Sequence, residues 1–354
     1  MRRPRCRPTA SCNGRPARRW PPRRTMRQPS KTMRADRRPT LFGPLRTFLL
    51  GVAATGTLFS QGPTDSLAAT RALLDSGKVQ EGETAIRVYL ASHPSSADAH
   101  FLLGYALFRE QKAQASLDEF TAGAKFRRPG SVELKIVAAD YVMLNDLSDA
   151  DKWFSQVVRE SPNDADAWYL LGRTKYNENE FAAAIAALEH ALTLHPKLVE
   201  AENNIGLAWK ELNDKDKARS AFATAIAWQG DAPLDAQPFL NLGTLCAESQ
   251  ENEKALPLLL RAQSLAPGNP SVHEELGKVY LAMNRLAEAQ AELERAVALS
   301  PETSSLHYKL GQVLRKEGQS ARAQEEFAIC ERLNGAHSSS KTPNPPAGNP
   351  RDPQ

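Results

Sequence analysis

The sequence predicts an all-α fold, a solenoid of helix-turn-helix repeats, and three observations support this prediction. A Leu-Gly dipeptide or a close variant recurs in a fixed phase, at Leu103-Gly104, Leu171-Gly172, Ile205-Gly206, Leu242-Gly243, Leu276-Gly277 and Leu310-Gly311. The spacing is 34 residues or twice 34, with one three-residue insertion near residues 231–235. Apolar residues within each half of a repeat follow the helical period, and a proline such as Pro196 or Pro301 closes many repeats.

The N-terminal segment differs in composition from the rest of the chain. Residues 1–60 hold 15 Lys and Arg against one acid, Asp36, whereas the remaining residues hold 30 basic and 40 acidic side chains. Residues 1–32 are rich in Arg and Pro and predict a disordered leader. Its basic character would suit a nucleic-acid arm. The alternative is upstream sequence that is not translated in the natural product, because Met26 and Met33 are both internal candidate starts.

Residues 33–60 have the layout of a secretory signal peptide. Four arginines, Arg34, Arg37, Arg38 and Arg46, precede a short apolar segment at residues 47–60. We therefore expect export from a bacterial cytoplasm to a periplasmic or secreted location. An uncleaved membrane anchor and an organelle transit peptide are the alternatives, and a membrane contact is expected only through an uncleaved leader. Without the leader the chain is acidic, which argues against a nucleic-acid partner.

Residues 63–337 are predicted to form eight repeats, each a hairpin of two helices. In the repeat that starts at Ala165, Trp168, Leu171 and Gly172 share one face of a first helix. Ala184 and Leu188 share one face of the second helix. The small residue at Gly172 lets the two helices approach closely. One hairpin cannot bury its apolar face alone, so successive repeats must stack. Residues 338–354, rich in Pro, Ser and Asn, are predicted to be a disordered tail.

These repeats resemble tetratricopeptide repeats (TPRs), which carry Trp, Leu, Gly and Tyr on the first helix and Ala, Phe, Ala and Pro on the second. The resemblance covers residues 63–337 and implies a right-handed superhelical solenoid whose first helices line a concave groove. Several repeats depart from the pattern, with Gly82 in place of Ala, Ala138 in place of Gly, and Gly230 and Gly335 in place of Pro.

The resemblance also implies which residues face the groove, and we expect a protein or peptide ligand there. The predicted peptide-binding residues are Phe101, Tyr105, Phe108, Lys135, Tyr169, Arg173, Tyr176, Asn204, Asn241, Lys309, Arg315 and Lys316.

Three of these predictions are more specific. Phe101, Tyr105 and Phe108 are expected to form an exposed aromatic cradle for an apolar segment, because Leu103, Gly104 and Leu107 already account for the packing face. Asn204 and Asn241 occupy equivalent places in successive repeats and suit a peptide backbone. Lys309, Arg315 and Lys316 form a basic cluster that suits an acidic partner. The family's carboxylate clamp is incomplete, because Lys135 fits one place but Ala139 and Leu170 occupy the next ones.

The sequence contains no phosphate loop, nucleophile elbow, Cys-x-x-Cys or His-Glu-x-x-His motif. His100, His273 and His307 fall at the fourth place of their repeats, and Cys246 and Cys330 fall at expected core positions. We therefore expect no catalysis, cofactor, metal site or small-molecule substrate. The sequence favours a non-enzymatic protein-binding scaffold. The alternative is a recruiting or regulatory subunit of an enzyme complex.

Overall fold

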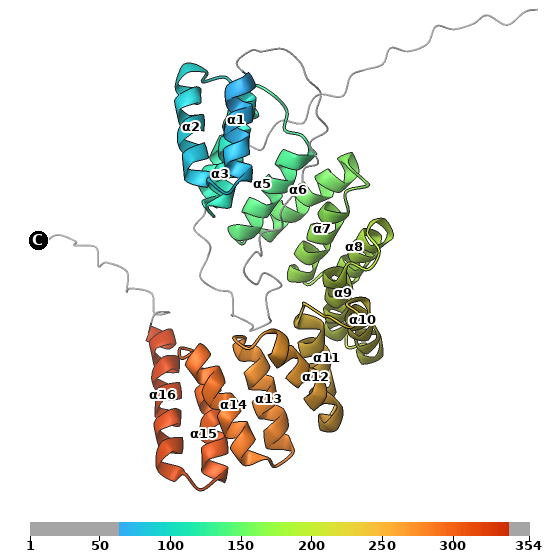
Figure 1. Ribbon diagram of the computed structural model, residues 1–354, viewed down its shortest axis with the longest axis vertical. Coiled ribbons are helices and arrows are strands. Elements are labelled where there is room, and N and C mark those ends of the chain that lie inside the picture. The colour runs from blue at the N-terminus through green and yellow to red at the C-terminus, as the bar shows by residue number, and fades with distance from the viewer. Residues whose placement is uncertain (1–63, 340–354) are drawn as a thin grey trace, which may run out of the picture. The chain divides into compact units, whose positions relative to one another are not determined.

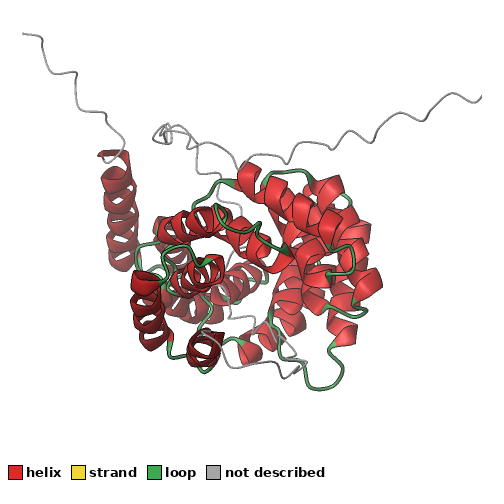
Figure 2. Ribbon diagram, turned by 90° about the horizontal axis from the view of Figure 1, so that it is seen from above, coloured by secondary structure: helices red, strands yellow, loops and turns green. Residues whose placement is uncertain are grey.

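The computed structural model describes residues 64–339, which contain sixteen helices and no strand (Figures 1 and 2). The helices are α1 Thr64–Asp75, α2 Val79–Ser92, α3 Ala97–Arg109, α4 Ala113–Gly123, α5 Ser131–Met143, α6 Leu147–Glu160, α7 Ala165–Asn177, α8 Phe181–Leu194, α9 Val199–Glu211, α10 Lys215–Trp228, α11 Gln237–Glu248, α12 Asn252–Leu265, α13 Pro270–Ala282, α14 Leu286–Leu299, α15 Ser304–Lys316 and α16 Ser320–Ser339. The prediction of an all-α array of helix-turn-helix repeats is confirmed. The leader at residues 1–60 lies outside the described residues, as does the tail from residue 340 onwards.

The chain divides into two compact units at Ser161 and Pro162. Among the described residues, the N-terminal unit contains the hairpins α1–α2, α3–α4 and α5–α6, and the C-terminal unit contains the five hairpins from α7 to α16. The two helices of each hairpin pack on each other, and within each unit the second helix also packs on the first helix of the next repeat. Each unit is therefore a continuous stack of hairpins.

The turn inside each hairpin has the same backbone conformation. Its fifteenth repeat residue has a positive φ in all eight hairpins, as Gly77, Gln111, Asn145, Asn179, Asn213, Gln250, Asn284 and Gly318. Gly and Asn tolerate this left-handed region, whereas other residues lose about 1–2 kcal/mol there. The sequence clustering of Asn at the mid-repeat turns has this conformational cause.

Gln250 has φ 62° at this place, and Gln250→Gly is expected to stabilise the C-terminal unit. The change removes backbone strain but adds flexibility to the unfolded chain, so we expect a net gain of about 0.5–1 kcal/mol. Urea unfolding followed by circular dichroism measures this gain. Ser249→Gly is the control, because Ser249 lies in the same turn with a negative φ of −90°. If both changes destabilise the protein equally, backbone strain at Gln250 is not the cause.

Close helix crossing inside the hairpins depends on the recurrent glycines. A Cβ atom placed at Gly104, Gly206 or Gly311 would lie 2.5–2.8 Å from the Phe ring sixteen residues later. Placed at Gly172, Gly243 or Gly277, it would lie 2.6–2.8 Å from the corresponding Leu. The third repeat has Ala138 at this place, opposite the buried Phe154. The predicted role of the small residue at the crossing therefore agrees with the structure.

The fourth residue of several repeats links that repeat to the one before. Trp168 donates its indole N–H to the carbonyl of Pro162 at 2.8 Å. His273 Nε2 lies 2.8 Å from the carbonyl oxygen of Pro267, and its Nδ1 lies 2.6 Å from Glu292 Oε2. His307 makes the same two contacts, with Pro301 and Glu326, and His100 makes them with Pro94 and Glu119. These histidines therefore have a structural role that their repeat position alone did not specify.

The first helices lie on the inner side of each stack. Within the C-terminal unit α7 contacts α9, α9 contacts α11 and α11 contacts α13, and within the N-terminal unit α1 contacts α3 and α3 contacts α5. The second helices make no comparable contacts with one another among the described residues. Each stack therefore curves with its first helices on the concave side. The resemblance to TPRs places a ligand on this concave face.

Of the two cysteines within the described residues, Cys246 is buried as expected, but Cys330 is only half-buried. The prediction of a core position for Cys330 was wrong because α16 is the last helix and no later repeat covers its outer side. No helix within residues 64–339 is both long enough and apolar enough to cross a bilayer.

Candidate functional site

The C-terminal end of the inner face is formed by α15 and exposes both basic and aromatic side chains. Tyr308 is 51% exposed, and Arg315 and Lys316 are also exposed. These residues are separated by seven and eight positions, which places all three on one side of the helix. Arg315 and Lys316 form no ion pair within residues 67–335, the range whose side chains are described. Two positive charges beside an exposed phenol ring are therefore available to a ligand.

The ring of Phe327 on α16 packs against both Tyr308 and Arg315. The Tyr308 and Phe327 ring centroids are 5.7 Å apart, and the Arg315 guanidinium carbon lies 5.7 Å from the Phe327 centroid. The packed ring restricts both side chains, so less conformational entropy is lost when a ligand binds them. We call Tyr308, Arg315 and Lys316 the α15 cluster.

The charge of Lys309 is not available to a ligand, because an acidic side chain already pairs with it. Its Nζ lies 2.8 Å from Glu274 Oε1 of α13. The neighbouring acid Glu275 is also paired, with its Oε1 2.8 Å from the Nζ of Lys278. Sequence spacing grouped Lys309 with Arg315 and Lys316, but the structure neutralises it across the two first helices. The acidic groups of α13 are thereby satisfied too, so Arg315 and Lys316 remain the uncompensated charges of this end.

The two predicted asparagines lie on adjacent first helices, but they are engaged in different contacts. Asn241 of α11 is half-buried and donates from Nδ2 to Asn203 Oδ1 at 2.8 Å. Asn204 of α9 is buried and its Nδ2 lies 3.5 Å from the Tyr169 hydroxyl. Asn241 is therefore the more accessible of the two, and a peptide backbone would have to compete with existing contacts at both.

The aromatic residues on α7 are mostly enclosed. Tyr169 and Tyr176 are only 8% and 4% exposed. The Arg173 guanidinium lies 5.5 Å from the Tyr169 ring centroid, and Tyr176 meets the edge of Phe181 at 5.4 Å. Burial raises the pKa of the Tyr169 phenol above its usual value, so it stays protonated and can act as a donor. These side chains shape the inner face more than they extend from it.

The predicted exposed aromatic cradle in the N-terminal unit was wrong at Phe101. This ring is 4% exposed and stacks on Phe120 of α4 at 5.8 Å. Gly123 provides the space, because a Cβ there would lie 2.6 Å from the ring. The Arg127 guanidinium covers the ring at 4.8 Å.

The rest of the N-terminal face is also mostly enclosed. Tyr105 and Phe108 are half-buried, and the Tyr105 hydroxyl accepts a hydrogen bond from Arg109 at 3.2 Å. Lys135, on the adjacent helix α5, is buried at 8% exposure. The N-terminal face thus keeps a partial aromatic surface at Tyr105 and Phe108, whereas Phe101 belongs to the core.

Two features escaped the sequence reasoning. Asp140 is fully buried on α5 at a place where the other repeats have apolar residues or Thr174, so its identity was itself a signal. Leu234 lies in the three-residue insertion and is 87% exposed. No group of three or more His, Cys, Asp or Glu side chains that could hold a metal ion occurs within the described part of the chain.

The comparisons with known proteins agree with this architecture. A tetratricopeptide repeat profile matches residues 67–132, 138–199 and 203–270, and a second profile of the same description matches residues 247–313. A tetratricopeptide repeat protein from Parabacteroides merdae superposes with a TM-score of 0.58 at 16% identity, over 71% of this chain and 98% of that chain. A chain of the APC/C Cut9–Hcn1 hetero-tetramer superposes with a TM-score of 0.55 at 18% identity, over 73% of this chain and 50% of that chain. Such identities show the fold alone.

The chain also matches curated proteins by sequence. Protein O-mannosyl-transferase TMTC1 of Mus musculus is 26% identical over 168 residues, which are 46% of this chain and 18% of that protein. The peroxisomal targeting signal receptor of Candida albicans is 25% identical over 185 residues, 40% of this chain and 31% of the receptor. The chain spans less than a third of the length of these relatives. Because the family profiles match more than half of its residues, the chain belongs to the tetratricopeptide repeat family.

Proposed function

We propose that this protein is a non-enzymatic scaffold that binds a segment of another protein on the inner face of its C-terminal unit. The α15 cluster would hold an acidic side chain of the ligand against Arg315 and Lys316, and a neighbouring apolar side chain against Tyr308. TPR scaffolds are typical of protein–protein interaction and are in general non-catalytic. One observation carries the proposal, namely that Arg315 and Lys316 are exposed and lack an ion pair among the described residues, whereas the acids of α13 are paired.

The distribution of charge explains the preference for an acidic ligand. Lys210 pairs with Glu248 at 2.7 Å, and Lys278 and Lys309 pair with Glu275 and Glu274, so the middle of the inner face is locally neutral. A ligand that crosses this face meets polar and apolar surface first and two positive charges at α15. A carboxylate at that end gains from both charges, and the gain should weaken as salt screens it.

Selection of a random peptide library displayed on phage tests this proposal with a defined probe. We expect the enriched peptides to carry Asp or Glu next to an aromatic or aliphatic residue. Arg315→Glu combined with Lys316→Glu should weaken their binding at least about tenfold, because both charges oppose the carboxylate after the change.

The matched control is Lys215→Glu combined with Arg332→Glu, which changes the net charge equally at exposed places on the second helices α10 and α16. It should leave peptide affinity almost unchanged. Equal weakening by both pairs would reduce the effect to net charge and contradict a site at α15.

We further propose that the protein works in the bacterial envelope, and this part rests on the signal-like layout of residues 33–60. N-terminal sequencing of the mature protein from an envelope fraction tests it, because an intact leader in a cytoplasmic fraction would contradict it.

The alternative function is that of a recruiting or regulatory subunit of an enzyme. The sequence matches to O-mannosyl-transferases support this alternative. A stoichiometric enzyme in the purified complex would support that alternative.

A further inference from the structure

The turn between α10 and α11, residues 229–236, contains the three-residue insertion and presents an apolar side chain to solvent. Leu234 is 87% exposed, the largest exposed fraction among the large hydrophobic side chains of residues 67–335. Its neighbours Pro233 and Ala236 are buried, so the turn is anchored on both sides of it.

The turn is also held in one conformation by polar contacts. Gln229 Oε1 accepts from the backbone N–H groups of Leu234 at 3.1 Å and Asp235 at 2.8 Å, and Gln229 Nε2 donates to the Asp235 carbonyl at 3.2 Å. Asp235 Oδ1 accepts from the backbone N–H of Gln237 at 2.9 Å. An exposed leucine on a fixed turn is a preorganised anchor, since little entropy remains to be lost when it enters a pocket.

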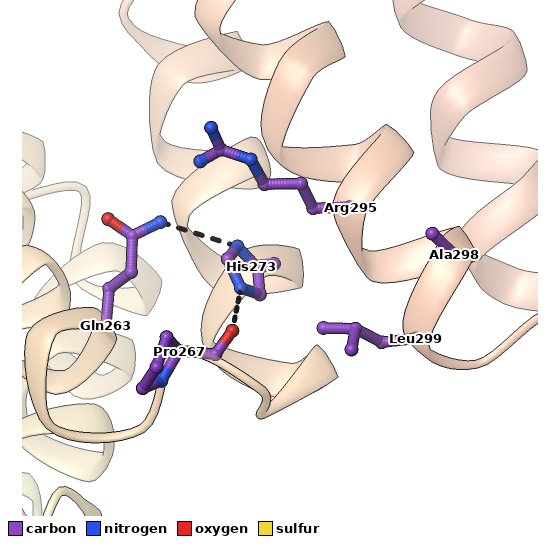
Figure 3. A pocket seen from close by; sticks show the side chains of 6 residues that line it. All are labelled: Gln263, Pro267, His273, Arg295, Ala298 and Leu299. Atoms are coloured by element: carbon purple, nitrogen blue, oxygen red, sulfur yellow. Dashed lines mark hydrogen bonds between the residues drawn. The ribbon is translucent and has the colours of Figure 1, made fainter.

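A shallow pocket of about 380 Å³, open to solvent, lies at the ends of α12 and α14 in the same C-terminal unit. Figure 3 shows its lining, in which the side chain of Leu299 points toward His273 and Pro267. Both ring nitrogens of His273 are already engaged, with Glu292 and the Pro267 carbonyl, so the ring adds no free polar atom to the pocket. The pocket therefore suits an aliphatic side chain.

Charge around the leucine complements charge around the pocket. Leu234 is flanked by the exposed Asp231 and the half-buried Asp235. Arg295 lines the pocket and is 60% exposed, and its Nη1 contacts Glu292 at 2.8 Å. No other contact of the Arg295 guanidinium is present within the described residues, so donors remain for an incoming carboxylate.

We propose that Leu234 of one molecule enters the pocket of a second copy of this chain, with Asp231 against Arg295, and that the contact is made twice. Leu234 follows the C-terminal end of α10, and the pocket lies at the C-terminal ends of α12 and α14, so in a stack of hairpins both lie at the same edge of the C-terminal unit. A contact that is made twice about a two-fold axis closes the assembly at a dimer. This edge is separate from the α15 cluster, so the dimer leaves the inner face open.

Sedimentation velocity of the full chain over a concentration series tests this proposal. The weight-average mass should rise from 38.9 kDa toward twice that value. Leu234→Ser should weaken association at least about tenfold, because two anchors are lost per dimer. It should not lower the melting temperature, since the side chain is exposed. The matched control Val88→Ser alters a side chain that is 69% exposed on α2 and should leave association unchanged.

Exchanging the two charges distinguishes this specific contact from non-specific hydrophobic association. Asp231→Arg and Arg295→Glu should each weaken the dimer, and the double variant should recover most of the lost affinity. A monomer at every concentration overturns the proposal. So does a dimer that Leu234→Ser leaves intact, or one that the double variant fails to restore, because the pocket would then have another occupant.

Discussion

Asp140→Asn is expected to stabilise the N-terminal unit at neutral and alkaline pH, by up to about 4 kcal/mol at pH 7. Asp140 is fully buried on α5, and burial raises the pKa of its carboxyl from 3.8 to about 8. Its Oδ2 lies 2.6 Å from the Ser116 hydroxyl, which is also 2.9 Å from the Gly104 carbonyl. A protonated Asp140 can donate to Ser116 while Ser116 donates to Gly104, so the neutral form satisfies this chain of hydrogen bonds.

The sign of the pH dependence follows from these two pKa values. Between about pH 4 and pH 8 the folded protein holds a proton on Asp140 that the unfolded chain has released. The contribution of Asp140 to stability is therefore complete below about pH 4 and is lost as the pH rises through about 8. Each pH unit in this window costs about 1.4 kcal/mol. Asn retains a donor for Ser116 but does not titrate.

Urea unfolding of both proteins between pH 5 and pH 8 measures the effect. The difference in unfolding free energy between Asp140→Asn and the parent should grow steadily with pH. Asp118→Asn is the control, because it removes the same charge from an exposed position on α4. A difference that is constant over this range would contradict a neutral Asp140 in the folded protein.

Gly206→Val is expected to destabilise the C-terminal unit by about 3 kcal/mol or more. A Cβ at Gly206 would lie 2.5 Å from the ring of Phe222, which is fully buried between α9 and its neighbours. The ring has no space to move, so the added side chain must push the two helices of the hairpin apart. The loss extends to the adjacent repeats because each hairpin completes the core of the next.

Thermal and urea unfolding measure this loss, and two further variants test its cause. Gly268→Val should change stability little, since nothing lies within 4 Å of a Cβ at that turn residue. Gly206→Val combined with Phe222→Leu should cost less than the sum of the two single changes, because the smaller side chain leaves part of the ring's space to the valine. If Gly268→Val is as damaging as Gly206→Val, close crossing does not explain the glycine.

The repeat pattern predicted the helices and their packing because both depend on local, periodic chemistry. The spacing of Gly172 and Leu188 predicts a close crossing of the two helices. Asn213 indicates a turn with positive φ, because few residue types tolerate that backbone conformation. The exposure of single side chains was harder to predict from the sequence. Phe101 is buried because Gly123 and Arg127, more than twenty residues later, enclose it.

The charges and exposed side chains of the proposed binding surfaces were predicted only in part for the same reason. Repeat position placed Arg315, Lys316 and Lys309 on one face, but it did not show that Glu274 neutralises Lys309 from the neighbouring helix. The exposure of Leu234 depends on the contacts of Gln229 within an irregular insertion, where the repeat pattern gives no guidance. Asp140 was visible as an exception to the pattern, but its effect depends on complete burial.

Lysine labelling in the presence of a selected acidic peptide tests the central claim most directly. Lys316 lies on the inner face at the end of α15, and Lys215 lies on α10, a second helix, and both are exposed. Acetylation with a small reagent, followed by mass spectrometry, reports the accessibility of each amine. Our account predicts that saturating peptide lowers the reactivity of Lys316 at least about fivefold and leaves that of Lys215 unchanged. Full peptide occupancy with undiminished reactivity at Lys316 would contradict a ligand site on the first helices.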